Sequence, residues 1–211
     1  FMGFSHPLRL KTEMWIKQGL SAEVLWGLIT REEAIKLVEE NVSKATWRNH
    51  MLAVEAIMRA LARELGKDEE LWGLVGLLHD LDYDKTANSP ERHGFVTAEM
   101  LRGKLSEEGI RAILAHNFEH TGIEPQTEME KALVASDAVS GLLVATALVM
   151  PSKKLEEVKV SSLRKKFKQK DFARGVSRER ILFCEQIGIP LERFFEISLE
   201  ALKPIASQLG L

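Results

Sequence analysis

Helix start and stop signals recur along this 211-residue chain, whereas the alternation of apolar and polar residues that marks β-strands is scarce. Thr30 with Glu33, and Thr127 with Glu130, have the spacing of capping boxes, in which two side chains satisfy free backbone amides of a helix's first turn. Apolar residues follow both pairs with helical periodicity. The sequence therefore predicts an all-α fold, a single-domain helical bundle.

The same signals place the other helices. Asp68 can cap an apolar helix, Gly66 can end the one before it, and Pro90 stands near a helix start. The longest apolar run ends at Pro151 near the lower length limit of a membrane span, and Asp137 interrupts it, so we expect a buried helix and no membrane contact. The expected helices cover 30–41, 46–65, 69–81, 90–105, 106–118, 128–150, 161–176, 177–188 and 190–210.

Charge and cysteine content narrow the classes of partner and compartment. The formal net charge is -2 and the pI is near 6.4, so no global basic field would draw the protein onto nucleic acid, and we do not expect that partner. Cys184 is the one cysteine, which excludes an intramolecular disulfide and a thiolate-rich zinc site. Residues 1–10 lack the apolar core of a secretory signal. We expect a cytoplasmic protein.

Four titratable residues fall inside apolar helical segments: His50, His79, Asp80 and Asp137. Burying an unpaired charge costs several kcal/mol or forces the group to become neutral. A metal ion would solve this for all four, because imidazoles and carboxylates are its ligands and its charge compensates the aspartates. Taken singly, each histidine is more often a core or capping residue, and each aspartate often caps a helix or pairs with arginine. Their joint occurrence favours the metal.

Adjacent residues on a helix project about 100 degrees apart, so His79 and Asp80 can bind one ion only at a helix end. The segment LDYD that follows them supplies such an end. The order His50, His79-Asp80, Asp137, with the blocks LLHD, RHGFVTAEMLR, ILAHN and ASDAVSGLL, resembles the HD-domain superfamily of metal-dependent phosphohydrolases, in particular its HDIG-type subgroup. This chain departs from the HDIGK block of that subgroup in having HDLDYDK.

The resemblance implies an HD core at about 45–145, preceded by N-terminal helices over 1–44 and followed by a helical extension over 151–211 packed on the core. It also implies that His93 and His116 hold a second metal, with Asp80 as the bridge between the two ions. One or two divalent ions are expected, and nitrogen and oxygen ligands suit Fe, Mn, Co, Ni, Zn or Mg.

The resemblance further implies hydrolysis of a phosphate ester, most often of a nucleotide, by metal-activated water. Asp80 belongs to that catalytic centre, and Asp82 or Asp84 could orient the water, although aspartates are also common in solvated turns. Lys85, which resembles the lysine of the HDIGK block, is the first candidate for binding the substrate phosphate. Arg48, two residues before His50, and Arg92, next to His93, follow it. Each of these three could equally be a solvated surface residue.

Two other functions use the same ligand pattern: a di-iron oxygenase of the HD type, and a sensory module that binds a nucleotide without turnover. Metal identity and O2 consumption separate the oxygenase from the hydrolase. The basic segment 164–174 is read most simply as a solvated face, although Phe167 and Phe172 within it require burial. A homodimer through the apolar stripe of the last helix is a further possibility.

Overall fold

The computed structural model describes residues 29–211. Within this range every regular element is a helix and no strand is found, which confirms the all-α prediction. The part of the predicted N-terminal helices that precedes residue 29 lies outside the described residues. The longer helices are α3 (Arg31–Asn41), α4 (Ala45–Leu65), α5 (Glu69–Leu78), α8 (Glu107–His116), α10 (Glu128–Leu148), α11 (Val160–Lys168) and α13 (Leu191–Leu202).

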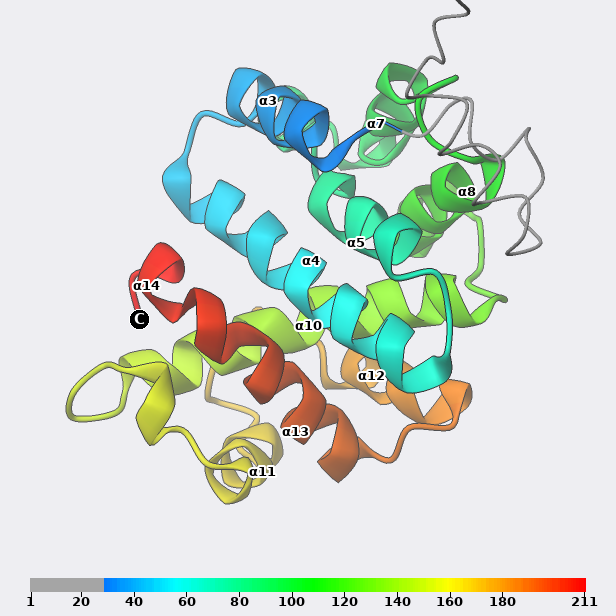
Figure 1. Ribbon diagram of the computed structural model, residues 1–211. Helices are drawn as coiled ribbons and strands as arrows, with labels where there is room; N and C mark the ends of the chain where they lie inside the picture. The colour runs from blue at the N-terminus through cyan, green and yellow to red at the C-terminus, as the bar shows by residue number, and fades with distance from the viewer. Residues whose placement is uncertain (1–28) are drawn as a thin grey trace, which may run out of the picture.

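Two long helices, α4 and α10, form the centre of the bundle (Figure 1). Helix α5 packs along α4 on one side, and α13 crosses α4 and α10 on the other. The core between them is closed to solvent, with Ile57 of α4, Leu77 of α5, Leu142 of α10 and Phe194 of α13 all at 0% exposure. Helices from opposite ends of the chain therefore bury one common core.

The N-terminal ends of α3 and α10 carry the predicted capping boxes, with Thr30 and Glu33 in one and Thr127 and Glu130 in the other. Helix α10 is long and apolar enough to cross a membrane, but 67% of its most apolar window is buried inside the protein. Its apolar surface is thus covered by the neighbouring helices, as expected for a core helix.

The predicted helix 90–105 is broken in the structure. A 3-10 helix (η1, Pro90–Arg92) and α7 (Phe95–Met100) are separated by Gly94, whose φ of 88 degrees lies in a region that favours glycine. The break leaves His93 in an extended conformation, with φ -63 and ψ 132 degrees. His93 is therefore presented from a bend.

The C-terminal region is also more interrupted than predicted. The segment 177–188 divides into α12 (Arg178–Ile181) and a 3-10 helix (η3, Leu182–Ile187), and the helix expected over 190–210 divides at Pro204 into α13, η4 (Lys203–Ile205) and α14 (Ala206–Leu209). All these elements pack on α10 or α4 or on each other. Cys184 is buried there, and burial raises the pKa of its thiol to about 12, which fits its reading as a small core residue.

The basic segment 164–174 is helical only as far as Lys168, at the end of α11. The chain that follows is folded around Arg178, whose guanidinium donates to backbone carbonyls of this segment, including those of Phe167, Phe172 and Ala173. Phe167 and Phe172 pack against the core, as their apolar character requires. Lys165, Lys166 and Lys168 therefore stand on α11, and Lys170 and Arg174 stand on the following loop, which Arg178 holds.

Candidate metal centre

Helix α5 ends where its apolar character ends, at His79 and Asp80. Asp68 caps the helix by accepting a hydrogen bond from the Leu71 amide, and every residue from Trp72 to Leu78 is buried. A Cβ atom at Gly76 would lie 2.9 Å from the Val54 carbonyl oxygen of α4, so glycine allows the two helices to approach closely. This contact brings the end of α5 next to His50, one turn before Val54 on α4.

Three helices supply the first half of the centre, which we define as His50, His79 and Asp137 around Asp80. The His50 Nε2 atom of α4 lies 3.2 Å from Asp137 Oδ1 of α10 and 3.7 Å from Asp80 Oδ2. The His79 Nε2 atom lies 3.4 Å from Asp80 Oδ1 and 4.0 Å from Asp137 Oδ1. Residues from three separate segments of the chain thus point their polar atoms at one place.

The second half consists of His93 and His116, which face the same carboxylate. Their Nε2 atoms are 3.0 Å apart and lie 3.2 and 3.4 Å, respectively, from Asp80 Oδ1. His93 comes from the bend before α7, and His116 is the last residue of α8. The structure therefore brings together all six residues that the sequence assigned to metal binding, with Asp80 between the two halves.

The four imidazoles share one orientation: each Nε2 atom faces the carboxylates, and each Nδ1 atom is held from outside. Nδ1 of His79 lies 2.8 Å from the Gly76 carbonyl oxygen, and Nδ1 of His116 contacts the Ile113 carbonyl. His50 Nδ1 lies 3.0 Å from Ser140 Oγ, and His93 Nδ1 lies 2.8 Å from Asp82 Oδ1. An acceptor at Nδ1 fixes the tautomer that leaves the Nε2 lone pair free for a metal.

The pKa values follow from burial and from the close packing of opposite charges. Burial lowers the pKa of His79 to about 4, so its imidazole is neutral near pH 7. Burial alone would raise the pKa of Asp80 and Asp137, but the surrounding imidazoles keep both carboxyls ionised, with a pKa of about 2 for Asp137. Burial would lower the pKa of His93, but Asp80 and Asp82 raise it to about 10. Neutral imidazole and ionised carboxylate are the forms that bind metal.

The residues present fit divalent metal ions. His50, His79 and Asp80 can offer ligand atoms within 4.8 Å of one another, and so can Asp80, His93 and His116. Within the described part of the chain, the His79 Nε2 atom is buried and has no hydrogen-bond partner. A buried polar atom without a partner is costly, and a metal ion would satisfy it. The donor set of nitrogen and oxygen matches metals such as Fe, Mn, Co, Ni, Zn or Mg.

Asp82 is buried beside the second half rather than exposed in a turn. Its Oδ1 atom contacts His93, and its Oδ2 atom accepts hydrogen bonds from the backbone amides of Gly94 and Thr97, at 2.9 and 3.0 Å. These side-chain contacts hold the bend that carries His93. They favour a positioning role over the predicted orientation of water.

Asp84 and Lys85 have contacts at the connection between α3 and α4. Asp84 Oδ2 accepts a hydrogen bond of 2.6 Å from the Ser43 amide, and the Lys85 ammonium donates to Asn41 Oδ1 at 2.7 Å. Both side chains are exposed, and neither hydrogen bond involves a histidine of the centre. These contacts favour structural roles over the predicted catalytic role of Asp84 and phosphate contact of Lys85.

The other two residues predicted to bind the substrate phosphate are Arg48 and Arg92. Arg48 donates to the carbonyls of Val42 and Ser43, at 2.8 and 2.9 Å, which occupies its guanidinium at the end of α3. Arg92 is exposed next to His93, and its role stays a prediction.

Arg180, a residue that sequence reasoning missed, is the cation that touches the centre. Its Nη1 atom lies 3.9 Å from Asp137 Oδ2, and its Nη2 atom contacts the His116 carbonyl and lies 3.6 Å from Glu119 Oε2. The side chain is 22% exposed. The stretch SRERIL around it predicts the start of an amphipathic helix, and nothing in it marks Arg180 as a site residue. Its placement depends on how α12 packs against α10, for which there is no local signal.

Comparison with known proteins agrees with this geometry. A family model described as "HD domain" matches residues 47–142. The chain contains an HD domain. This confirms the resemblance that the ordered histidines and aspartates indicated, and the HD superfamily consists mostly of metal-dependent hydrolases. Arg180 lies outside the matched residues, in the C-terminal extension.

One curated relative is Ribonuclease Y of Sulfurovum sp. (strain NBC37-1), which is 29% identical over 161 residues. The alignment covers 72% of this chain and 31% of that protein, so the chain spans about a third of its relative's length. No solved structure matches the chain.

Proposed function

We propose that this HD protein hydrolyses a phosphate ester, using water activated at the centre around Asp80. The observation that carries the proposal is the convergence of four Nε2 atoms on two carboxylates, with every Nδ1 atom held from outside. A hydrogen-bonded core cluster has no need to leave His79 Nε2 without a partner, whereas a metal ligand does.

In this proposal the first half and Asp80 hold one divalent ion, and His93 and His116 with Asp80 hold a second. When bound, such ions lower the pKa of water to about 7 and polarise a phosphoryl oxygen. Asp80 serves as the shared ligand. Asp82 positions His93 by accepting a hydrogen bond from its Nδ1–H group, and Ser140 does the same for His50.

We assign the phosphate contact to Arg180. Its guanidinium reaches the centre beside Asp137 while the backbone carbonyl of His116 orients it, so it can present N–H donors to a phosphoryl oxygen. An arginine so placed also offsets negative charge that develops on the phosphoryl group during attack. Arg92 remains a second candidate because of its position next to His93.

Nucleotides are the substrate class that we propose first, because they dominate the chemistry of the HD superfamily. RNA is a second candidate, which the name of the relative suggests. The observation that favours it is the basic segment 164–174, whose second part is held by Arg178, two residues before Arg180 in the chain. A cytoplasmic location, membership of the HDIG-type subgroup and a homodimer stay predictions.

The test combines metal analysis with a substrate screen. Purified protein is analysed for metals, reloaded with each candidate ion, and assayed with nucleoside mono-, di- and cyclic phosphates and with short RNA. We expect phosphate or nucleotide release by the wild type and none by Asp80→Ala. Asp84→Ala is the matched control, because it removes a neighbouring carboxylate that contacts Ser43, and it should keep its metal and activity.

The alternatives predict other results from the same samples. An oxygenase would consume O2 in its iron form and release no phosphate. A binding module would bind a nucleotide without turnover in any metal form. Equal activity of Asp80→Ala and the wild type would rule out the proposed centre.

A further inference from the structure

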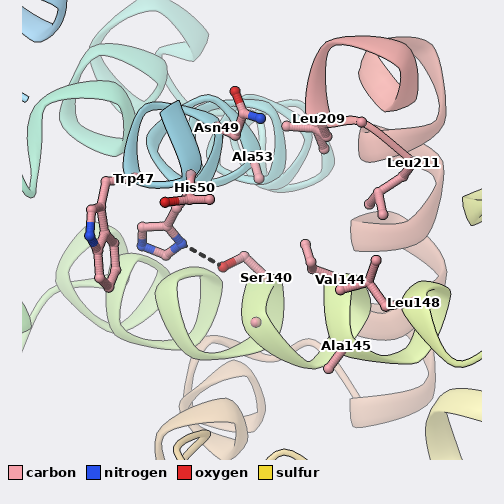
Figure 2. A pocket seen from close by; sticks show the side chains of 13 residues that line it. Trp47, Asn49, His50, Ala53, Ser140, Val144, Ala145, Leu148, Leu209 and Leu211 are labelled. Atoms are coloured by element: carbon pink, nitrogen blue, oxygen red, sulfur yellow. Dashed lines mark hydrogen bonds between the residues drawn. The ribbon is translucent and has the colours of Figure 1, made fainter. Parts of the chain in front are cut away.

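A pocket of about 430 Å³ opens on the Nδ1 side of His50, between α4, α10 and the end of α14 (Figure 2). His50 and Ser140, joined by their hydrogen bond, stand at one end with Trp47 beyond them. Aliphatic side chains form the other end, including those of Val144, Leu148 and Leu211. Because His50 turns its Nε2 atom to Asp80 and Asp137, one imidazole separates the pocket from the carboxylates. The volume lies in the range of small-molecule sites.

The Ser140 hydroxyl, which contacts His50 in this pocket, already uses its single proton. Ser140 Oγ donates to the Asp137 carbonyl at 2.8 Å and lies 3.0 Å from His50 Nδ1, whose proton it can accept. Among the described residues that line the pocket, none is Asp, Glu, Lys or Arg. Besides Trp47, His50 and Ser140, Thr46 and Asn49 are the described residues that bring polar side-chain atoms to this lining, so a ligand rich in hydrogen-bonding groups would lose most of its bonds to water there. A hydrocarbon chain has no hydrogen bonds to water to lose, and its transfer from water into the pocket is favourable.

The end of the pocket away from His50 also exposes apolar surface to solvent. Leu148 is 49% exposed although it lies at the end of a core helix. Its side chain and that of Val144 point from α10 toward the space below α4 (Figure 2). A chain that entered past Leu148 and ran toward His50 would cover both residues and end next to the proposed metal centre.

We propose that this pocket binds an aliphatic chain. The inference rests on the proposed function in that it concerns the same centre. The chain can be the leaving group of a phosphate ester substrate, or it can belong to a separate effector that packs against His50 and Ser140. The chemistry of the pocket is the same in both cases. The two sources differ in whether the chain and the phosphate belong to one molecule.

The first experiment measures the binding of 1-hexanol, 1-octanol and 1-decanol to the whole protein by calorimetry, in the metal-free and the metal-loaded form. Each buried methylene should tighten binding about fourfold. Val144→Phe fills the pocket and should weaken 1-octanol binding about tenfold or more. Val149→Phe is the matched control, because Val149 is 55% exposed and does not line the pocket, and it should bind as the wild type does.

A second experiment separates the two sources by using 1-octyl phosphate, 1-octanol and inorganic phosphate with metal-loaded protein. If the chain belongs to the substrate, 1-octyl phosphate binds more tightly than either fragment, and each fragment displaces it. If the chain is a separate effector, octanol and phosphate bind together and octyl phosphate gains nothing over octanol. Either result supports the proposal and identifies the source.

Three results would overturn the proposal: no increase of affinity with chain length, unchanged binding by Val144→Phe, or adenosine displacing 1-octanol at lower concentration than 1-decanol does. The last would indicate a nucleobase subsite beside Trp47. Alkanol binding requires no turnover. A protein that binds alkanols as described but hydrolyses no phosphate ester would therefore contradict the proposed function and leave the pocket assignment intact.

Discussion

The two halves of the centre share Asp80 but are built differently. His50 and Asp137 of the first half stand on α4 and α10, which are 21 residues long each and cross in the core. His93 of the second half stands in a bend between a three-residue 3-10 helix and the six-residue α7. Side chains on packed helices keep their geometry better than side chains on short connections. We infer that the first half is the tighter metal site and that the second depends on Asp82.

The largest effect should come from breaking the first half. His79→Ala removes a ligand that is closed to solvent and whose Nε2 atom has no other partner in the described structure. We expect loss of the metal held there and a fall in phosphate ester hydrolysis of more than about 100-fold, since even residues that only support ligands contribute 10 to 100-fold. Metal analysis of the purified variant checks this. Two metals per chain in His79→Ala would contradict the ligand assignment.

Breaking the second half should have a smaller effect on metal content. His93→Gln should reduce the stoichiometry by one ion and leave the first half loaded. In the described structure, the ion pairs of His50, His79 and Asp137 join these residues to one another, to Asp80 and to Arg180, and not to His93. Metal analysis and circular dichroism of the variant provide the measurement and the control for folding. If His93→Gln lost all metal, the two halves would not be separable.

The dependence of the second half on Asp82 can be tested without removing a ligand. Asp82→Asn is nearly isosteric and can still accept the Gly94 and Thr97 amides, but its amide group would face His93 Nδ1 as a donor. The favoured tautomer would then carry its proton on Nε2, and affinity for the second ion should fall about 10 to 100-fold. Ser140→Ala removes the corresponding contact of His50, which is with an uncharged hydroxyl. Its effect on the metal affinity of the first half should be smaller than the effect of Asp82→Asn on the second half. Equal metal titrations of Asp82→Asn and the wild type would refute the dependence.

The halves should also differ in how metal affinity responds to pH. In the first half, His79 has a pKa of about 4 and carries no proton that a metal must displace near pH 7. Burial would lower the pKa of His50, but Asp137 and Asp80 raise it, so His50 is the one imidazole of this half that can hold such a proton. In the second half, His93 has a pKa of about 10. A cation that enters the second half must release the His93 proton, so its affinity should rise about tenfold per pH unit below pH 10. Competition titrations between pH 7 and 9 measure this slope. The slope of the second half should exceed that of the first, and equal slopes would refute the difference.

Much of this arrangement could be predicted from the sequence, because its causes are local. The capping box at Thr127, the αL glycine at Gly66 and the apolar helix before His79 each depend on a few neighbouring residues. Four of the proposed ligands were found because titratable groups in apolar helices require a common explanation. The resemblance to the HD family then added His93 and His116.

The remainder depends on packing between distant segments. Arg180 reaches Asp137 only because α12 lies against α10, and Asp82 is buried only because the chain bends at Gly94. In the same way, Lys85 is turned toward Asn41, 44 residues earlier in the chain. None of these contacts follows from local propensity or periodicity. The residues predicted to bind the phosphate are therefore cations that lie near the proposed ligands in the sequence.

The close approach of α4 and α5 at Gly76 sets a tolerance for the size of the bound ion. The carbonyl of Gly76 orients His79. Because Gly76 has no side chain, the backbone of Val54 can approach it closely. The span between the His50 and His79 nitrogens is consequently fixed by main chain against main chain, which yields much less than side-chain packing does. We therefore expect Gly76, which would coordinate no ion, to influence which ionic radius the centre accepts.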